Sequence, residues 1–432
     1  MTPMYLPSDV KACIDALEQA GFAAYAVGGC VRDSLLGRTP SDFDLCTAAL
    51  PEETEWVFRD HKLVLAGKKH GTVSVVTPGG LVEITTFRTE GEYRDNRHPA
   101  WVKFVTDITG DLARRDFTIN AMAWSPYRGF ADPFGGQEDL KNHVLRAVGD
   151  PAQRFREDSL RILRGIRFAA KYHLATDPET ETAMFAMKDL MDNLARERVF
   201  EELCKLLLVC DAGDLERFAP IITAVIPELT DSVGFQQHNP HHTKDVYGHT
   251  AQVVEGVPKH LALRWAALLH DSGKPATFTM DETGTGHFYG HAKISVQIAN
   301  QVLRRLKAPT ALREQVIFLV EKHMTPLTAD RKLLRRRLSQ YGEENLRLLL
   351  DLQTADGLDT QEIRPLVAEL LAEEGCLKLK DLAINGNDLM ALGFSGRAIG
   401  QCLQSLLDQV LDETLPNEKA ALLQAATERK SQ

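Results

Sequence analysis

The sequence predicts an α+β fold in which a strand-rich head is followed by a helical remainder. Strand patterns gather in about the first 145 residues, and almost every later segment has helical periodicity. The chain has 432 residues, which is too long for one ordinary hydrophobic core. A hydrophobic content of 44% and a charged content of 25% are typical of a globular protein in water.

The head is predicted to begin with a helix that Ser8 caps and Gly21 ends. Four segments have strand patterns, and the PGG turn within the third joins two strands as a hairpin. These segments are AAYAVGG (23–29), KLVLAG (62–67), TVSVVTPGGLVEITTF (72–87) and WVKFVTDIT (101–109). We expect four domains, with the boundaries 1–145, 146–230, 231–360 and 361–432.

Composition narrows the class of protein. Seven cysteines, an odd number without metal-ligand spacing, indicate reduced thiols and a cytoplasmic location. No apolar run reaches 18 residues and the N-terminus lacks a basic region before an apolar core, so we expect neither a membrane span nor a signal peptide. The net charge of −10 argues against a uniformly basic nucleic-acid binder, although local patches can still bind RNA.

The stretch GGCVRDSLLGRTPSDFDL combines two features that suit a nucleotide. Gly28 and Gly29 end a strand and open a helix whose free N–H groups suit triphosphate oxygens, and Arg32 can add a charge-assisted clamp. If DFD lies on a strand, Asp42 and Asp44 point the same way and repel each other unless a cation lies between them. Mg²⁺ is the cation that accompanies nucleotide phosphates.

A second motif, LARRDFTINAMA, carries Arg114, Arg115 and Asp116 directly into an apolar segment that includes Asn120. Such a charged triplet is commonly a surface ion pair. Its continuation into apolar sequence favours phosphate-facing arginines and a carboxylate near the metal. Glu83, on a predicted strand, is an equally good third carboxylate, and the sequence does not choose between Glu83 and Asp116.

The third motif is RFREDSLRILRGIRF, in which Asp158, Arg161, Arg164 and Arg167 recur every three residues. On one helix they form a stripe along one face. An ordinary amphipathic helix with an ion pair would give the same spacing. An aspartate that accepts from an exocyclic amine and an arginine that donates to a ring nitrogen would fit cytosine and adenine but repel uracil and guanine. One Asp–Arg pair of this stripe could therefore select cytosine and adenine.

These three motifs, together with DPFGGQEDL (132–140), resemble the head and neck of class II tRNA nucleotidyltransferases, the bacterial CCA-adding enzymes and their poly(A) polymerase relatives. The resemblance implies a polymerase-β-like head in which Asp42 and Asp44 hold two Mg²⁺ ions. It also implies that Asp158 and Arg161 read the incoming base, with Arg164 and Arg167 near them. It implies template-independent addition of the 3′-terminal CCA to tRNA from CTP and ATP, with neither a membrane nor DNA as partner. Glu83 and Asp116 stay candidate catalytic carboxylates. The candidate nucleotide-binding residues are Gly28, Gly29, Arg32, Arg114, Arg115, Asn120, Asp158, Arg161, Arg164 and Arg167.

A separate histidine set lies in the helical half, where His270 is followed directly by Asp271. A lone histidine is usually a core or surface residue, but this adjacent pair has further histidines on both sides. The set resembles the HD superfamily of metal-dependent phosphohydrolases and implies an HD-type helical body. The implied ligands of a divalent transition metal are His249, His270, Asp271 and Asp356, and His291 and His323 extend the site. Met324 departs from relatives that carry Asp there, which bears on hydrolase activity.

Residues 301–347 hold eleven Lys or Arg against five Asp or Glu, so this acidic chain has one basic segment. A basic run is usually a solvated helix face, but here it is also a candidate phosphate-binding surface. The C-terminal segment from Leu382 to Leu411 resembles the helical tail of HD-containing CCA-adding enzymes, which implies tRNA binding by residues 361–432.

Three alternatives to full CCA addition follow from the same motifs. A poly(A) polymerase would share the head, but those relatives generally carry long basic extensions that this sequence lacks. A narrower alternative is a CC-only or A-only enzyme. TEGEYRDNRHPAWVKF (89–104) resembles the flexible loop of full CCA-adding enzymes, which CC-adding relatives lack. An HD phosphohydrolase with an RNA-binding head would not need the Asp42 and Asp44 pair. We therefore expect full CCA addition.

Overall fold

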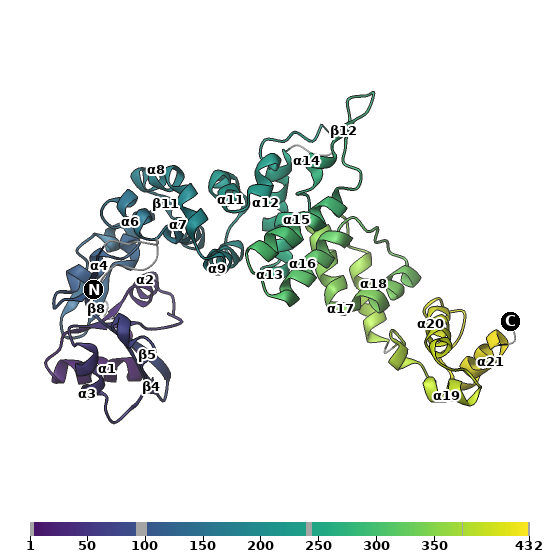
Figure 1. The fold of residues 1–432 in the computed structure, drawn as a ribbon, viewed down its shortest axis with the longest axis horizontal. Helices are drawn as coiled ribbons and strands as arrows, with labels where there is room; N and C mark the ends of the chain where they lie inside the picture. Colours follow the sequence, from purple (N-terminus) through teal and green to yellow (C-terminus); the bar gives the residue numbers. More distant parts are fainter. Residues whose placement is uncertain (1–3, 92–101, 239–243, 374, 431–432) are drawn as a thin grey trace. The chain divides into compact units, whose positions relative to one another are not determined.

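The computed structural model describes residues 4–91, 102–238, 244–373 and 375–430. The chain divides into two compact units, one made of Met1–Thr230 with Arg305–Lys307 and the other of the remaining residues. The first unit combines sheet and helices, and the second is almost entirely helical, as the α+β prediction requires (Figure 1). No helix in the described ranges is both long and apolar enough to cross a membrane.

The head contains a seven-stranded mixed sheet with the order β3-β4-β5-β2-β1-β8-β9. Strand β2 is parallel to β5, and the other neighbouring pairs are antiparallel. The strands are β1 (Ala24–Val27), β2 (Leu45–Thr47), β3 (Lys62–Val64), β4 (Thr72–Thr77), β5 (Gly80–Thr86), β8 (Ala123–Ser125) and β9 (Gly129–Ala131). The predicted hairpin is confirmed, because β4 and β5 pair across the PGG turn.

In the described part of the head, five α-helices and one small sheet accompany the seven-stranded sheet. The helices are α1 (Ser8–Gln19), α2 (Gly29–Leu35), α3 (Pro51–Val57), α4 (Ile108–Ala113) and α5 (Gly136–Lys141). Strands β6 (Arg88–Glu90) and β7 (Val102–Phe104) form a separate antiparallel pair. They flank the predicted flexible loop, whose residues 92–101 lie outside the described part of the chain. Buried Val27, Phe87 and Leu112 belong to the core beneath the sheet.

Two local predictions in the head are wrong. Ser8 is the first residue of α1 rather than its cap, and no side chain caps this helix; Pro7 precedes it in extended conformation. Asp42 and Asp44 do not lie on a strand, since β2 begins only at Leu45. The two carboxylates sit in the irregular segment that leads into β2.

The neck is helical, with one short parallel pair of strands between β10 (Val144–Leu145) and β11 (Ala175–Thr176). Its helices are α6 (Pro151–Glu157), α7 (Leu160–Tyr172), α8 (Pro178–Ala186), α9 (Arg196–Leu207), α10 (Ala212–Arg217) and α11 (Ala219–Val225). The predicted single helix through RFREDSLRILRGIRF is wrong, because Asp158 is extended (φ −148°, ψ 100°) and separates α6 from α7.

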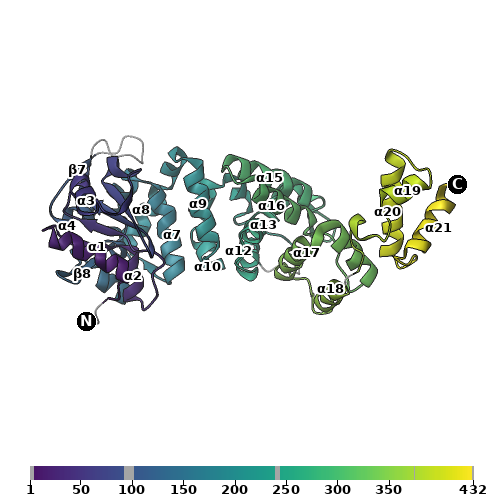
Figure 2. The same cartoon turned by 90° about the horizontal axis from the view of Figure 1, so that it is seen from below.

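In the second unit, α13 packs against α12, α16 and α17 (Figure 2). The helices are α12 (Val246–Gly256), α13 (Leu261–Leu269), α14 (Lys274–Thr277), α15 (His291–Arg305), α16 (Thr310–Lys322), α17 (Arg331–Ala355) and α18 (Ile363–Ala372), with a small hairpin of β12 (Thr279–Met280) and β13 (Gly286–His287). The tail helices α19 (Gly386–Ala391), α20 (Arg397–Leu411) and α21 (Lys419–Lys430) share a core of their own around buried Leu389, Leu406 and Leu422.

Candidate active site and candidate metal centre

A polar cavity of about 480 Å³ in the first unit brings together most of the predicted nucleotide-site residues. It is lined by Gly28, Gly29, Arg32, Asp33, Ser41, Asp42, Asp44, Arg114, Arg115, Asp116, Asn120, Asp158, Leu160, Arg161, Arg164, Phe168, Lys171 and Arg198. Two predicted residues are absent from this lining, Glu83 and Arg167.

The glycine pair lies where the chain passes from β1 into α2. Gly28 has φ 76°, a left-handed conformation that favours glycine, and a Cβ atom there would lie 2.8 Å from Arg115 Nη1. Helix α2 then presents buried Arg32, whose guanidinium donates to Asn120 Oδ1 and lies 4.5 Å from the ring centroid of Tyr172. The arginine is thus held on two sides before any ligand arrives.

Strand register brings a third carboxylate, Glu83, beside Asp44 of the cavity lining. Strands β2 and β5 run parallel with Leu45 beside Ile84, so the preceding residues Asp44 and Glu83 are also neighbours. The pKa of Asp44 is raised by desolvation first, although its side chain reaches solvent, and then by the charges of Asp42 and Glu83; Arg115 opposes the shift. Hard carboxylate oxygens in mutual repulsion are a donor set that fits Mg²⁺.

Asp116 differs from those three carboxylates because its oxygens are already engaged. Arg164 donates to Oδ2 from Nε at 2.9 Å and from Nη2 at 2.6 Å, and Asn120 Nδ2 donates to Oδ1 at 3.0 Å. Burial opposes ionisation, but Arg164 and Asn120 outweigh it and hold the pKa of Asp116 well below its usual range. A chain of contacts therefore runs from Arg32 through Asn120 and Asp116 to Arg164.

The arginine pair before Asp116 depends on a residue that sequence reasoning missed. Buried Asp111 accepts from Arg114 at 2.8 Å and from Arg115 at 3.3 Å. The two arginines keep this carboxylate ionised, since its pKa is lowered in spite of burial. The signal that could have found Asp111 is its spacing, three and four residues before the arginines on a short helix.

The predicted base-reading pair lies in the cavity, but each member has protein partners. Asp158 Oδ2 accepts from Arg198 Nη2 at 2.7 Å. Arg161 donates to Glu157 Oε2 at 2.7 Å and to the carbonyl of Arg114 at 3.0 Å. Arg198 comes from α9 and had no motif to indicate it. Arg167 instead pairs with Glu202 of α9.

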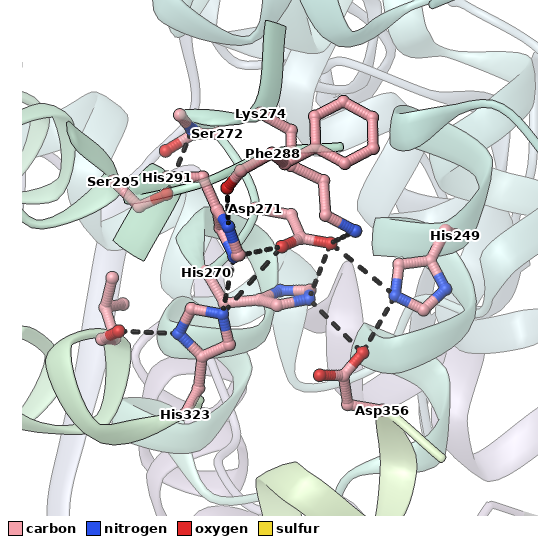
Figure 3. Close-up of polar contacts among 12 residues, drawn as sticks. His249, His270, Asp271, Ser272, Lys274, Phe288, His291, Ser295, His323 and Asp356 are labelled. Carbon is pink, nitrogen blue, oxygen red and sulfur yellow. Dashed lines mark hydrogen bonds and ion pairs between the residues drawn. The ribbon is translucent and has the colours of Figure 1, made fainter. Parts of the chain in front are cut away.

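The second unit brings the histidine set together at the ends of its helices (Figure 3). His249 comes from α12 and His291 begins α15. The other residues follow helix ends, His270 and Asp271 after α13, His323 after α16 and Asp356 after α17. Two overlapping groups have ligand atoms within 4.8 Å of one another, and Asp271 belongs to both: His249, His270 and Asp271, and Asp271, His291 and His323.

The four predicted ligands are close enough to share one ion. Asp356 Oδ1 lies 2.9 Å from His249 Nε2 and 3.7 Å from His270 Nε2. Asp271 Oδ2 lies 3.6 Å from His249 Nε2 and 3.2 Å from His270 Nε2. His270 Nε2 is buried and makes no hydrogen bond of acceptable geometry. Buried Asp271 Oδ2 has the Lys274 ammonium 2.7 Å away. Imidazole nitrogens and carboxylate oxygens this close together fit a bound cation.

The arginines of the basic segment on α17 are largely compensated within the second unit. Arg335 lies 2.8 Å from Glu413 and 3.2 Å from Glu373, and Arg336 Nη2 lies 2.5 Å from Asp412 Oδ2. The local excess of positive charge that the sequence indicates is therefore reduced by carboxylates from the tail.

The head combines an arginine-lined cavity with a cluster of carboxylates, which is typical of a nucleotidyltransferase. Sequence profiles of the Poly A polymerase head domain, of the probable RNA and SrmB-binding site of polymerase A and of the putative tRNA nucleotidyltransferase domain 2 match residues 24–146, 173–215 and 279–426. The CCA-adding enzyme of Levilactobacillus brevis is 34% identical over 98% of this chain and 99% of its own length. The chain belongs to the CCA-adding enzyme family.

Solved structures agree with this assignment. The Bacillus stearothermophilus CCA-adding enzyme in complex with CTP has a TM-score of 0.75 at 27% identity and covers 100% of this chain and 98% of its own. The Thermotoga maritima CCA-adding enzyme complexed with tRNA_CCA, at 22% identity, shares the fold with a TM-score of 0.63 over 99% of this chain and 97% of its own. The prediction of a CCA-adding fold is confirmed.

Proposed function

We propose that the protein adds or repairs the 3′-terminal CCA of tRNA, using CTP and ATP without a nucleic-acid template. The observation that carries this proposal is one cavity lined both by the Asp42 and Asp44 carboxylates and by Asp158 and Arg161. In this proposal, nucleotidyl transfer and base selection take place in the same cavity. Family membership over nearly the whole chain supports the same reaction.

In this proposal, the cationic and the anionic residues of the cavity have different roles. Arg32, Arg114 and Arg115 line the cavity as cations for the triphosphate, and the Gly28–Gly29 turn allows its close approach to backbone N–H groups. Asp42 and Asp44, with Glu83 as the third carboxylate, would hold Mg²⁺. When bound, Mg²⁺ activates the 3′-hydroxyl of the RNA and stabilises the leaving pyrophosphate.

Asp116 serves a different role in this proposal, because Arg164 and Asn120 occupy its oxygens. We assign it to positioning: it links the phosphate side of the cavity, through Asn120, to the base-reading helix α7, through Arg164. Asp158 and Arg161 would read the exocyclic amine and ring nitrogen that cytosine and adenine share.

The test is nucleotide addition to three defined tRNAs, which end before the CCA, after the first C and after the second C. Each is incubated with one labelled NTP at a time. We expect CTP to extend the first two and ATP to extend only the third. Runs of A on any substrate would favour a poly(A) polymerase, and arrest after CC would favour a partial enzyme. No incorporation at all would leave only the hydrolase alternative.

We also propose the domain division 1–145, 146–230, 231–360 and 361–432 for head, neck, metal-binding body and tRNA-binding tail. The body and tail would contact the tRNA away from its 3′ end. A cytoplasmic location fits seven cysteines that are all free thiols.

A second function is supported by the histidine cluster. We propose that His249, His270, Asp271 and Asp356 hold a divalent transition metal, with Ni²⁺ and Mn²⁺ to be tried beside Mg²⁺. The site would hydrolyse phosphate esters such as 2′,3′-cyclic phosphates. When bound, the metal polarises the phosphoryl group. Lys274, whose Nζ lies 2.7 Å from Asp271 Oδ2, is placed to pair with the substrate phosphate.

The hydrolase proposal is tested with 2′,3′-cyclic nucleotides and each metal. Asp271→Ala should abolish turnover and leave CCA addition unchanged, since the two sites belong to separate units. His287→Ala is the matched control, because half-buried His287 pairs with Asp281 rather than with the cluster. Absence of turnover by the parent protein with all three metals would refute the proposal.

A further inference from the structure

The cations that line the polar cavity of the first unit differ in whether a carboxylate already pairs with them. The lining contains six arginines, and each lies within ion-pair distance of a carboxylate. The pairs are Arg32–Asp33, Arg114–Asp111, Arg115–Asp111, Arg161–Glu157, Arg164–Asp116 and Arg198–Asp158. Lys171 also lines the cavity, but no carboxylate of the described residues lies within ion-pair distance of its ammonium.

Other positive charges gather close to Lys171, around the ring of buried Tyr172. Lys171 Nζ lies 5.0 Å from the centroid of this ring. Arg32 Cζ lies 4.5 Å and Arg38 Cζ lies 5.1 Å from the same centroid. An aromatic face attracts a cation, so one ring holds three like charges near one another. Because like charges repel, an anion that enters the cavity beside them is favoured.

The carboxylate of Asp33 belongs to the same cluster, but it already has partners. Its Oδ1 accepts from Arg32 Nε and from the Tyr172 hydroxyl, each at 2.9 Å. The pKa of Lys171 is lowered by desolvation first, although the residue is exposed. Asp33 opposes this shift, and the charges of three arginines, Arg32 among them, add to it. A bound anion would therefore stabilise the charged form of Lys171.

The place of Lys171 along α7 indicates which part of a nucleotide it would meet. Arg161 and Lys171 lie on one face of this helix, because the cavity-lining residues between them recur at intervals of three and four residues. At about 1.5 Å per residue, the two are about 15 Å apart along the helix axis. Lys171 shares an aromatic ring with Arg32, which is proposed to contact the triphosphate. A nucleotide whose base is read by Arg161 would thus direct its terminal phosphate toward Lys171.

We propose that Lys171 binds the γ-phosphate of the incoming CTP or ATP and thereby distinguishes nucleoside triphosphates from diphosphates; this inference rests on the proposed CCA addition. In that reaction the 3′-hydroxyl oxygen of the RNA forms a bond to the α-phosphorus, the bond from this phosphorus to the β-phosphate oxygen breaks, and pyrophosphate leaves. A diphosphate offers the same bond at its α-phosphorus, so only a contact beyond the β-phosphate separates the two substrates. An ammonium, a compact charge with three donors, suits a terminal phosphate.

A purely structural role for Lys171 is the alternative. The residue lies in the last turn of α7, where a cation also interacts favourably with the helix dipole. Loss of that role would lower the stability of the helix and would not depend on which nucleotide is bound. Because Lys171 is exposed, its substitution leaves the core intact, and nucleotide affinity can be measured on the folded protein.

The test compares the binding of CTP and CDP. Equilibrium dialysis of the full-length protein with Mg²⁺ and without RNA gives both dissociation constants, since no 3′-hydroxyl is present for transfer. Lys171→Ala should weaken CTP binding by about tenfold and CDP binding by less than about twofold, because only CTP carries a γ-phosphate. Lys171→Arg keeps a cation and should retain most of the preference for CTP. Lys141→Ala is the matched control and should change neither affinity, because the Lys141 side chain is 78% exposed on α5 and lies outside the cavity lining.

The possible results separate this inference from the proposed function. Equal weakening of CTP and CDP by Lys171→Ala, or no weakening of either, would overturn the γ-phosphate contact. Normal CTP binding with a reduced gel-shift affinity for tRNA would assign Lys171 to an RNA phosphodiester and would also overturn it. In each of these cases CCA addition by the parent protein stands. A parent protein that binds CTP through Lys171 but adds no nucleotide to tRNA would contradict the proposed function and leave the contact, whereas a parent that binds no CTP would overturn both.

Discussion

Replacing Asp116 by Ala should destabilise the first unit rather than merely remove a catalytic group. The buried carboxylate accepts two bonds from Arg164 and one from Asn120. Removing one partner of a buried ion pair costs about 3–5 kcal/mol. The Arg164 side chain is 36% exposed, so water can replace part of what it loses. We therefore expect a loss of about 2–3 kcal/mol in the free energy of unfolding.

Thermal unfolding provides the measurement. For a unit of this size, each kcal/mol lost from the free energy of unfolding lowers the melting temperature by roughly 2–4 °C. The melting temperature of the first unit should therefore fall by about 5–10 °C. Glu83→Ala is the matched control, because Glu83 is an exposed carboxylate. It should leave stability within about 0.5 kcal/mol and yet abolish nucleotide addition.

The pH dependence of this effect has a definite sign. The pKa of Asp116 is lower in the folded than in the unfolded chain, so its stabilisation is complete above about pH 4 and is lost as the pH falls further. The difference in stability between the parent and Asp116→Asn should be constant from about pH 5 to about pH 8 and should shrink in more acidic solution. An Asp116→Ala protein that unfolds like the parent but adds no nucleotide would refute this reasoning and make Asp116 the third metal carboxylate.

Three further predictions concern the nucleotide cavity. Asp42→Ala or Asp44→Ala should lower the rate of nucleotide addition by about a thousandfold, since a lost metal ligand removes several kcal/mol of transition-state stabilisation. The affinity for tRNA in a gel-shift assay should stay nearly unchanged. More than a few per cent residual activity in both variants would contradict the assignment of these residues as metal ligands. Asp158→Ala with Arg161→Ala should raise UTP and GTP incorporation by about ten- to hundredfold relative to CTP and ATP, and strict specificity in that variant would refute side-chain base reading. Shortening the loop within 89–104 by several residues should spare the two C additions and cut A addition by orders of magnitude in single-nucleotide assays; completion of CCA at the parent rate would make the loop a mere connector.

The sequence indicated the cavity well because its residues lie in contiguous motifs. Gly28, Arg32 and Asp44 are close in the chain, and the turn from β1 into α2 brings the first two to the cavity mouth. Glu83 could be named only as an alternative, because its position beside Asp44 depends on the parallel register of β2 with β5. Register between strands that are about forty residues apart is set by the whole sheet, not by local pattern.

Partners contributed by distant helices could not be predicted. Arg198 of α9 donates to Asp158. Glu202 of the same helix pairs with Arg167, which the sequence predicted to bind the nucleotide. Both belong to an ordinary amphipathic pattern, so nothing local distinguishes them. The histidine cluster was easier to predict, because His270 and Asp271 are adjacent in the sequence. Which histidines each oxygen of Asp271 faces could not be predicted, because it depends on side-chain orientation.

The break between α6 and α7 bears directly on the proposed base reading by Asp158 and Arg161. On one continuous helix, Asp158 and Arg161 would be rigidly linked, and one fixed pattern would have to serve both cytosine and adenine. Because Asp158 is extended, a small change in its backbone angles can move the carboxylate without unwinding either helix. Arg198 holds Asp158 from α9, whereas Arg161 is held by Glu157 and the Arg114 carbonyl. The two members of the pair are thus anchored to different parts of the unit, which is the arrangement that a pocket accepting two bases of different size requires.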